Sequence, residues 1–221
     1  DPLADEGDVE QNYAVFDPST GTLTFQYGAL PPGTAHMFDN CNGKLTTLDL
    51  SVLDTSNVTD MTGLLNGCQR LTTLTLGGSF STANVRGMDS MFSSCNSLVS
   101  LDVSGFDTTN AQTMCSMFDG CSKLTSLDLS SFNTLSGSFM DNMFGNCPAL
   151  QSVTLGKDFS MLGHDIWNDA NAGSLPVPEV RHVQDRCGQL GRQGAGTIQI
   201  LLHLQRQGAK ANDKDGRRQG A

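Results

Sequence analysis

Hydrophobic positions recur along the chain with a period of 26 or 27 residues. Five cysteines mark this period at intervals of 27, 27, 26 and 26 residues: Cys41, Cys68, Cys95, Cys121 and Cys147. An apolar pair precedes each cysteine, while an L-x-x-L-x-L phrase and then one bulky apolar residue follow it, as in Met117-Phe118, Leu124/Leu127/Leu129 and Phe132. A repeat of this length indicates an array of stacked structural units.

Each unit contains two hydrophobic periods. In TSLDLS, residues 125–130, apolar residues alternate with small polar ones, which predicts a short strand with one buried face. Upstream of the cysteine, apolar residues recur every three or four positions, a spacing typical of a short helix or helical turn: Val58, Met61, Leu64, Leu65, Cys68 and Leu71. Each unit is therefore expected to form a strand, a polar corner and a helical return. The helical turns are expected to be capped by Asn57, Asn84 and Asn110.

A single unit cannot fold alone. It offers about nine apolar side chains, each worth about 2 kcal/mol on burial. Against this stands an ordering entropy of about 1 to 2 kcal/mol per residue. Stacking makes the core continuous, so stability grows with the number of repeats. The predicted fold class is an α/β repeat solenoid, a leucine-rich-repeat-like stack of about five short parallel strands with helical returns.

Both ends of the chain depart from the repeat. Residues 13–27, YAVFDPSTGTLTFQY, alternate apolar and polar positions around a Pro-Ser-Thr-Gly turn, which predicts a capping β-hairpin. The predicted organisation is a disordered N-terminus (1–11), the hairpin (12–35), the solenoid (36–167) and an irregular or disordered basic tail (168–221). From residue 176 on there is no Phe, Tyr, Trp or Met, and the apolar run 198–204 is compatible with a short helix. This abrupt change also fits a truncated or frame-shifted reading.

The net charge of −10 is unevenly distributed. Residues 1–175 hold 5 Lys and Arg against 19 Asp and Glu, and residues 176–221 hold 8 against 4. An acidic body repels phosphate backbones, so nucleic acid is not an expected partner. No stretch approaches the roughly 20 apolar residues of a membrane span. The chain begins Asp-Pro-Leu without a leader, so we expect a mature product or a cut fragment.

The five cysteines in register allow two interpretations. Neighbouring strands lie about 4.8 Å apart, a distance that a disulfide tolerates. However, five thiols cannot all pair, and each lies at a core position, where free cysteine is a well-buried small hydrophobe. Zinc is not expected, because the repeats contain no C-x-x-C and no nearby His pair. The sequence therefore predicts a buried column of thiols, with Cys115 and Cys187 as the fast-reacting ones.

The outward strand positions form columns of small polar residues. Aligned aspartates could bind Ca²⁺ or act as paired carboxylates in carbohydrate cleavage, but Thr75 and Thr154 interrupt that column. There is no catalytic triad, Walker-type loop or dinucleotide fingerprint, so we expect no enzyme and no cofactor. Solvated surface and a ligand-binding face remain open as interpretations. The candidate binding residues are Thr47, Asp49, Ser51, Thr73, Thr75, Ser100, Asp102, Ser104, Ser126, Asp128 and Ser130.

The phrases MFxxCxxLxxLxLSxFxTxN and NVTDM resemble the BspA-like leucine-rich repeat surface proteins of bacteria, in their 26-residue variety. YAVFDPSTGTLTF resembles the hairpin that often precedes such arrays, and the match covers residues 12–162. Leu64-Leu65 in place of Met-Phe and the loss of Asn-Val at residues 135–139 depart from the pattern, and the tail matches nothing in it.

The resemblance implies a secreted or cell-wall-attached protein. Its array would bind host matrix, mucus glycoprotein or a neighbouring cell surface, with Asp49, Asp102 and Asp128 conferring specificity. The alternative is a passive structural spacer within a longer surface protein, without a ligand of its own. A carbohydrate-active enzyme, the third interpretation, would need one repeat with exceptional acidic residues, and none stands out.

Overall fold

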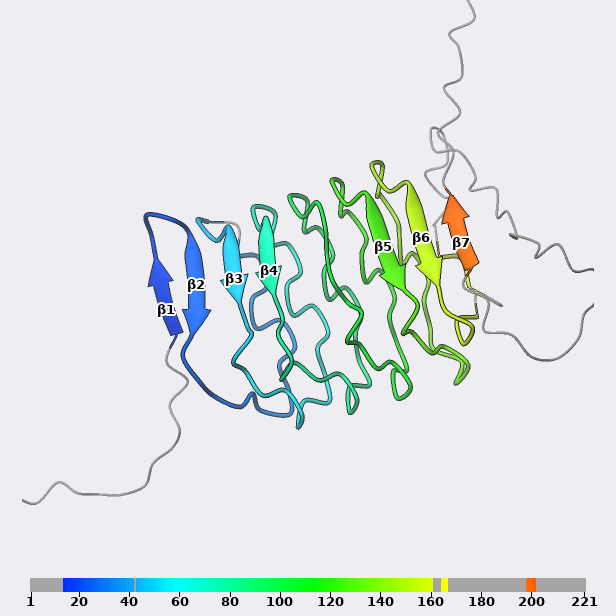
Figure 1. Cartoon of the computed structure of the whole chain (residues 1–221), viewed down its shortest axis with the longest axis horizontal. Helices are drawn as coiled ribbons and strands as arrows, with labels where there is room; N and C mark the ends of the chain where they lie inside the picture. The colour runs from blue at the N-terminus through cyan, green and yellow to red at the C-terminus, as the bar shows by residue number, and fades with distance from the viewer. Residues whose placement is uncertain (1–13, 42, 161–163, 167–197, 202–221) are drawn as a thin grey trace, which may run out of the picture.

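The computed structural model describes residues 14–41, 43–160, 164–166 and 198–201 (Figure 1). We number the repeats 1 to 5 by their cysteines, from Cys41 to Cys147. Equivalent segments of successive repeats lie side by side along the long axis of the molecule. Short strands form one side of this array, and turns form the other.

The strands form two sheets. The first has the order β1-β2-β3-β4 and contains β1 (Ala14–Asp17), β2 (Thr22–Phe25), β3 (Thr47–Asp49) and β4 (Thr73–Thr75). β1 and β2 pair antiparallel as the predicted hairpin, whereas β2, β3 and β4 pair parallel. The second sheet has the order β5-β6-β7 and contains β5 (Ser126–Leu129), β6 (Ser152–Leu155) and β7 (Ile198–Leu201). β5 and β6 run parallel, and β7 runs antiparallel beside β6.

The strand register agrees with the predicted columns. Thr47 lies opposite Thr73, and Ser126 lies opposite Ser152. Side chains alternate in burial along a strand. In β5, the side chains of residues 126 to 129 are in turn exposed, buried, exposed and buried. The period-2 pattern in the sequence thus predicted both the faces and the pairing of these strands.

Repeat 3 departs from the expected stack of five parallel strands. Residues 98–103, which carry its L-x-x-L-x-V phrase, form no strand. Across the described residues, one backbone hydrogen bond joins this segment to repeat 4, from the Thr125 N–H to the Val99 carbonyl at 3.4 Å, and none joins it to β4. The sheet is therefore interrupted between β4 and β5.

The expected helical returns are wrong, because the described residues contain no helix. Along each return, backbone N–H groups alternate between two kinds of acceptor. The Phe38 N–H donates to the Leu64 carbonyl of the next repeat at 2.9 Å, whereas the Asp39 N–H donates to the His36 carbonyl, three residues earlier, at 3.1 Å. An α-helix would instead direct every N–H to the carbonyl four residues earlier.

Left-handed backbone explains why the returns are not helical. Each repeat has positive φ one and five residues before its cysteine, as at Gly63 (φ 61°) and Gly67 (φ 73°) of repeat 2. A left-handed residue ends a right-handed helix, so two of them four residues apart leave no room for one. The other residues in these two columns are His36, Asn40, Ser90, Ser94, Ser116, Gly120, Asn142 and Asn146.

Two of the three asparagines expected to cap helices, Asn84 and Asn110, join repeats instead. The Asn84 side-chain amide donates to the Ser56 carbonyl, and that of Asn110 donates to the Ala83 carbonyl, both at 2.8 Å. Each of these bonds reaches back into the preceding repeat. They therefore help to hold the stack together rather than ending a helix.

The core consists of columns of identical side chains. Phe92, Phe118 and Phe144 stack with ring centroids 5.7 and 5.8 Å apart, and Phe106 stacks between Phe80 and Phe132. The cysteines form a parallel column in which each thiol from repeat 2 on donates to a carbonyl of the preceding repeat: Cys68, Cys95, Cys121 and Cys147. These four are buried and free, as predicted, but Cys41 at the end of the column is only half-buried.

A column of buried threonines was not predicted. The Thr108 hydroxyl donates to the Asn133 carbonyl of the next repeat at 3.0 Å and accepts the Asn133 N–H at 2.8 Å. Three other threonines each make the same pair of bonds with one residue of the next repeat. Thr55 bonds with Ser81, Thr82 with Asp107, and Thr134 with Ser160. A side chain thus supplies the pairing that a strand backbone would otherwise supply at this corner.

The apolar run of the tail forms a strand rather than the short helix or disorder expected. β7 pairs with β6 over four residues, with Ile198 opposite Leu155 and Ile200 opposite Val153. The sequence Ile-Gln-Ile has the alternation and β-branching of a strand. Its partner, β6, is the last strand of the repeats and would otherwise present an unpaired edge.

Candidate functional site

The candidate binding residues lie on one face of the array, which we call the strand face. Of the eleven, eight are exposed, and Thr47, Asp49 and Ser51 are half-buried. The sheets place Asp49 beside Thr75 and Asp128 beside Thr154. Ser100 and Asp102 belong to the same columns but lie in the segment that forms no strand, and Ser104 begins the corner after it.

The three aspartates of the strand face stabilise their own corners. An Oδ1 atom accepts the backbone N–H of the serine two residues on in each case: Asp49 from Ser51 at 2.9 Å, Asp102 from Ser104 at 3.0 Å and Asp128 from Ser130 at 2.9 Å. The Ser104 hydroxyl and then its N–H lower the pKa of Asp102, because both bonds favour the charged carboxylate. Asp102 is therefore ionised at neutral pH.

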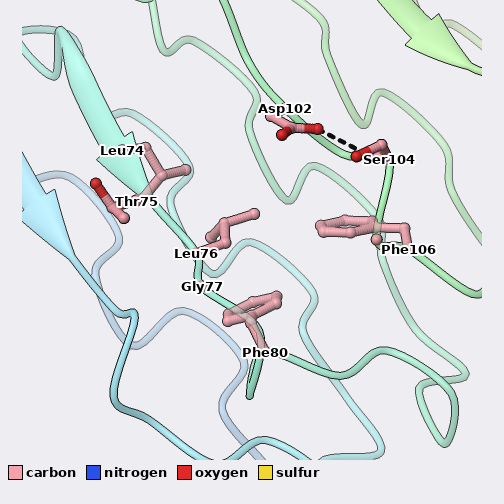
Figure 2. A pocket seen from close by; sticks show the side chains of 9 residues that line it. Leu74, Thr75, Leu76, Gly77, Phe80, Asp102, Ser104 and Phe106 are labelled. Atoms are coloured by element: carbon pink, nitrogen blue, oxygen red, sulfur yellow. Dashed lines mark hydrogen bonds between the residues drawn. The ribbon is translucent and has the colours of Figure 1, made fainter.

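A groove interrupts the strand face between repeats 2 and 3 (Figure 2). Its volume is about 340 Å³. One wall comes from β4 and the corner after it, and the other comes from the corner of repeat 3. The residues that line this strand-face groove are Leu74, Thr75, Leu76, Gly77, Phe80, Asp102, Ser104, Gly105 and Phe106.

Two leucines that line the groove, Leu74 and Leu76, and the neighbouring Leu101 are more exposed than their equivalents in repeats 1, 4 and 5. Leu74, Leu76 and Leu101 are half-buried, whereas the corresponding residues of repeats 1, 4 and 5 are at most 3% exposed: Leu48, Leu50, Leu127, Leu129, Val153 and Leu155. Loss of strand pairing around repeat 3 therefore uncovers apolar surface that the paired strands of other repeats keep covered.

The sequence carries a signal for this groove in the length of the corner that follows each strand position. The corner after the strand has three residues in repeat 2, Gly77–Ser79, and two in repeat 3, Ser104–Gly105. The groove coincides with this step, where the corner shortens; the other steps keep or lengthen it.

The remaining expectations concern two reactive cysteines, a metal site and a membrane span. Cys115, predicted to be a fast-reacting thiol, is half-buried, and its N–H donates to Asp89 Oδ1 at 2.7 Å. Burial raises the pKa of the Cys115 thiol. Cys187 lies outside the described residues. Among the residues described, no three His, Cys, Asp or Glu side chains are grouped as a metal site would require, and no helix is long and apolar enough to cross a membrane.

Residues 33–156 match a protein family described as "Mycoplasma protein of unknown function, DUF285". The chain belongs to this family. In this DUF285 member, the matched region contains all five repeat cysteines and excludes both the hairpin and the tail. No curated protein matches the chain significantly. The crystal structure of a leucine-rich repeat protein from T. pallidum is similar, with 15% sequence identity, a TM-score of 0.36, and coverage of 64% of this chain and 78% of that one.

Proposed function

We propose that this protein is a non-catalytic binding module of a cell surface or the extracellular space, and that the strand face is its contact surface. The observation that supports this proposal is the alignment of exposed hydroxyl and carboxylate side chains over a closed apolar core. Rows of weak hydrogen-bonding groups at fixed spacing suit a large, repetitive ligand, because many weak contacts add up in a multivalent complex. Host matrix, mucus glycoprotein and the surface of a neighbouring cell are ligands of this kind.

A passive spacer is the competing function, since a stack of repeats can also hold another domain away from a surface. The two functions differ in a single property, saturable binding. Resemblance to BspA-like proteins in the Met-Phe, Cys and Leu phrases favours the binding module.

A pair of matched variants tests the proposal. The first variant, Asp102→Asn/Asp128→Asn, removes two charges from the strand face. The second, Asp54→Asn/Asp107→Asn, removes two charges outside the strand face, each directly after the bulky apolar residue of its repeat. All four carboxylates accept an N–H two residues on, at 2.8 to 3.0 Å. Asn133 already makes this bond to the Leu135 N–H at 3.1 Å, so asparagine preserves the turn.

Binding is measured on immobilised fibronectin, laminin, collagen and mucin. Loss of charged hydrogen bonds predicts that the strand-face variant binds about tenfold more weakly or worse, while the second variant stays within about twofold of wild type. Absence of saturable binding to every surface would favour the spacer. An equal loss in both variants would mean that net charge, and not the strand face, carries the interaction.

A further inference from the structure

The strand-face groove is the point where the periodic array stops being periodic. Strands pair at the steps from repeat 1 to 2 and from repeat 4 to 5, whereas repeat 3 forms no strand with either neighbour. At the groove, between repeats 2 and 3, Leu74 and Leu76 are half-buried, as is Leu101. A repeated surface can bind many copies of a ligand, but a local exception defines a single site.

The groove also has backbone groups that, among the described residues, make no backbone hydrogen bond to repeat 3. In β4, the Thr73 N–H donates to Thr46 and the Thr75 carbonyl accepts from Leu50, so both residues point toward repeat 1. Alternation along a parallel strand directs the N–H and C=O of Leu74 and Leu76 the other way, toward repeat 3. Among the described residues, no backbone bond joins them to residues 99–103. The wall therefore offers both donors and acceptors to a ligand.

The remaining groups give the groove a mixed character. Leu74, Leu76 and the buried rings of Phe80 and Phe106 supply apolar surface, and Thr75, Asp102 and Ser104 supply hydroxyl and carboxylate oxygens (Figure 2). A ligand that fits must have hydrogen-bonding groups around its edge and apolar C–H on its faces. Pyranose sugars have this distribution.

Size decides between a sugar and an extended peptide. A strand inserted between repeats 2 and 3 would need a separation of roughly 9.5 Å, twice the spacing of paired strands. The Phe80 and Phe106 centroids are only 6.0 Å apart, and a backbone bridge between Asp60 and Gly87 also joins repeats 2 and 3. A volume of about 340 Å³ lies at the low end of small-molecule sites. The groove therefore accommodates one ring rather than a strand.

Charge narrows the ligand further. Asp102 is an exposed carboxylate at the mouth of the groove, and the chain carries a net charge of −10. An anionic sugar would be repelled by the Asp102 carboxylate and by the net negative charge of the chain. We infer that the strand-face groove binds a single neutral pyranose unit, such as the terminal sugar of a glycan, through Asp102, Ser104 and the backbone edge of β4. This inference rests on the proposed function, and it assigns that function a ligand class and one site.

The test is an amide NMR titration of the full chain with methyl glycosides of glucose, galactose, mannose and N-acetylglucosamine. The methyl glycoside of sialic acid and the peptide acetyl-Lys-Val-Lys-Val-amide serve as comparisons. At least one neutral pyranoside should give saturable shifts confined to residues 74–77 and 100–106. Stronger binding of the peptide or of the anionic sugar would overturn the assignment.

Two variant pairs locate the site. Asp102→Asn should raise the Kd about tenfold or more. Asp107→Asn, which removes a carboxylate with the same local turn in the same repeat, should change it less than twofold. Gly105→Val should block the groove and Gly78→Val should not, since a Cβ meets nothing within 4 Å at either glycine and only Gly105 lines the groove.

The outcomes separate this inference from the proposed function. If Asp128→Asn weakens binding as much as Asp102→Asn, the ligand spans the whole strand face, so the proposed function stands and the single site fails. Binding to matrix proteins without any response to the neutral sugars would likewise support the proposed function and refute the single sugar site. Loss of all saturable binding, to surfaces and sugars alike, would refute both.

Discussion

Thr108 provides the sharpest test of how the repeats are joined. Its side chain is completely buried, and its hydroxyl makes two hydrogen bonds with the backbone of Asn133. Thr108→Val keeps the shape but leaves both Asn133 groups without this partner, at about 1 to 3 kcal/mol for each. Thr108→Ser keeps the hydroxyl and loses one methyl group, at about 1 kcal/mol. Valine should therefore cost roughly 2 to 6 kcal/mol, at least about twice as much as serine.

Urea unfolding at pH 7, followed by circular dichroism, measures this difference as a shift of the midpoint at constant slope. Thr125→Val is the control, because Thr125 is exposed and should change the free energy of unfolding by no more than about 0.5 kcal/mol. A serine variant less stable than the valine variant would show that methyl packing, and not the hydroxyl, holds repeat 3 to repeat 4.

Three further predictions concern the core, the thiols and acid. Phe118→Ala should cost about 3 to 5 kcal/mol in the same assay, because the ring is buried between two others; a cost under about 1 kcal/mol would contradict the stacked column. A thiolate-directed reagent should modify Cys41 and Cys115 well before the buried thiols. Loss of hydration raises the pKa of Cys68 and Cys147 to about 12, and it raises the pKa of Cys95 and Cys121 as well. Equal modification rates for all these thiols in the folded protein would refute their burial. Hydrogen bonds from Ser104 and Thr109 depress the pKa values of Asp102 and Asp107 below 3.8 in the folded chain, so their stabilisation is present above that pH and is lost as pH falls through the folded values. The Asp102→Asn/Asp107→Asn variant should therefore lose less thermal stability than wild type between about pH 5 and 2, by a small margin because both groups are exposed, and an unchanged loss would contradict this.

Local patterns in the chain predicted much of the strand face. Alternation around Leu127 and Leu129 fixed which side chains face the core, and the period of 26 residues fixed that Thr47 would meet Thr73 and Asp128 would meet Thr154. The buried face and the register both depend on spacing along the chain. Alternation sets the buried face, and units of equal length stack with equivalent residues side by side. The column of buried thiols followed from the same argument, except at Cys41, where the column ends.

Patterns alone misassigned the returns. Apolar residues every three or four positions bury the same face in a helix and in the turns seen here. The choice depends on whether an N–H such as that of Phe38 bonds within its own repeat or to Leu64 of the next. The Gly and Asn residues among the positions one and five before the cysteines were the available signal, since these residue types adopt positive φ most readily.

The period, the core columns and the polar face could be predicted from the amino-acid sequence, since each follows from residue order within one unit. The threonine bonds and the position of β7 became visible only in the folded chain, and so did the groove at repeat 3, which the sequence marks only by a shorter corner. These features depend on backbone groups of different repeats meeting or failing to meet. A hydrogen bond between two repeats exists only when both are in place, and one repeat's residues do not contain that information.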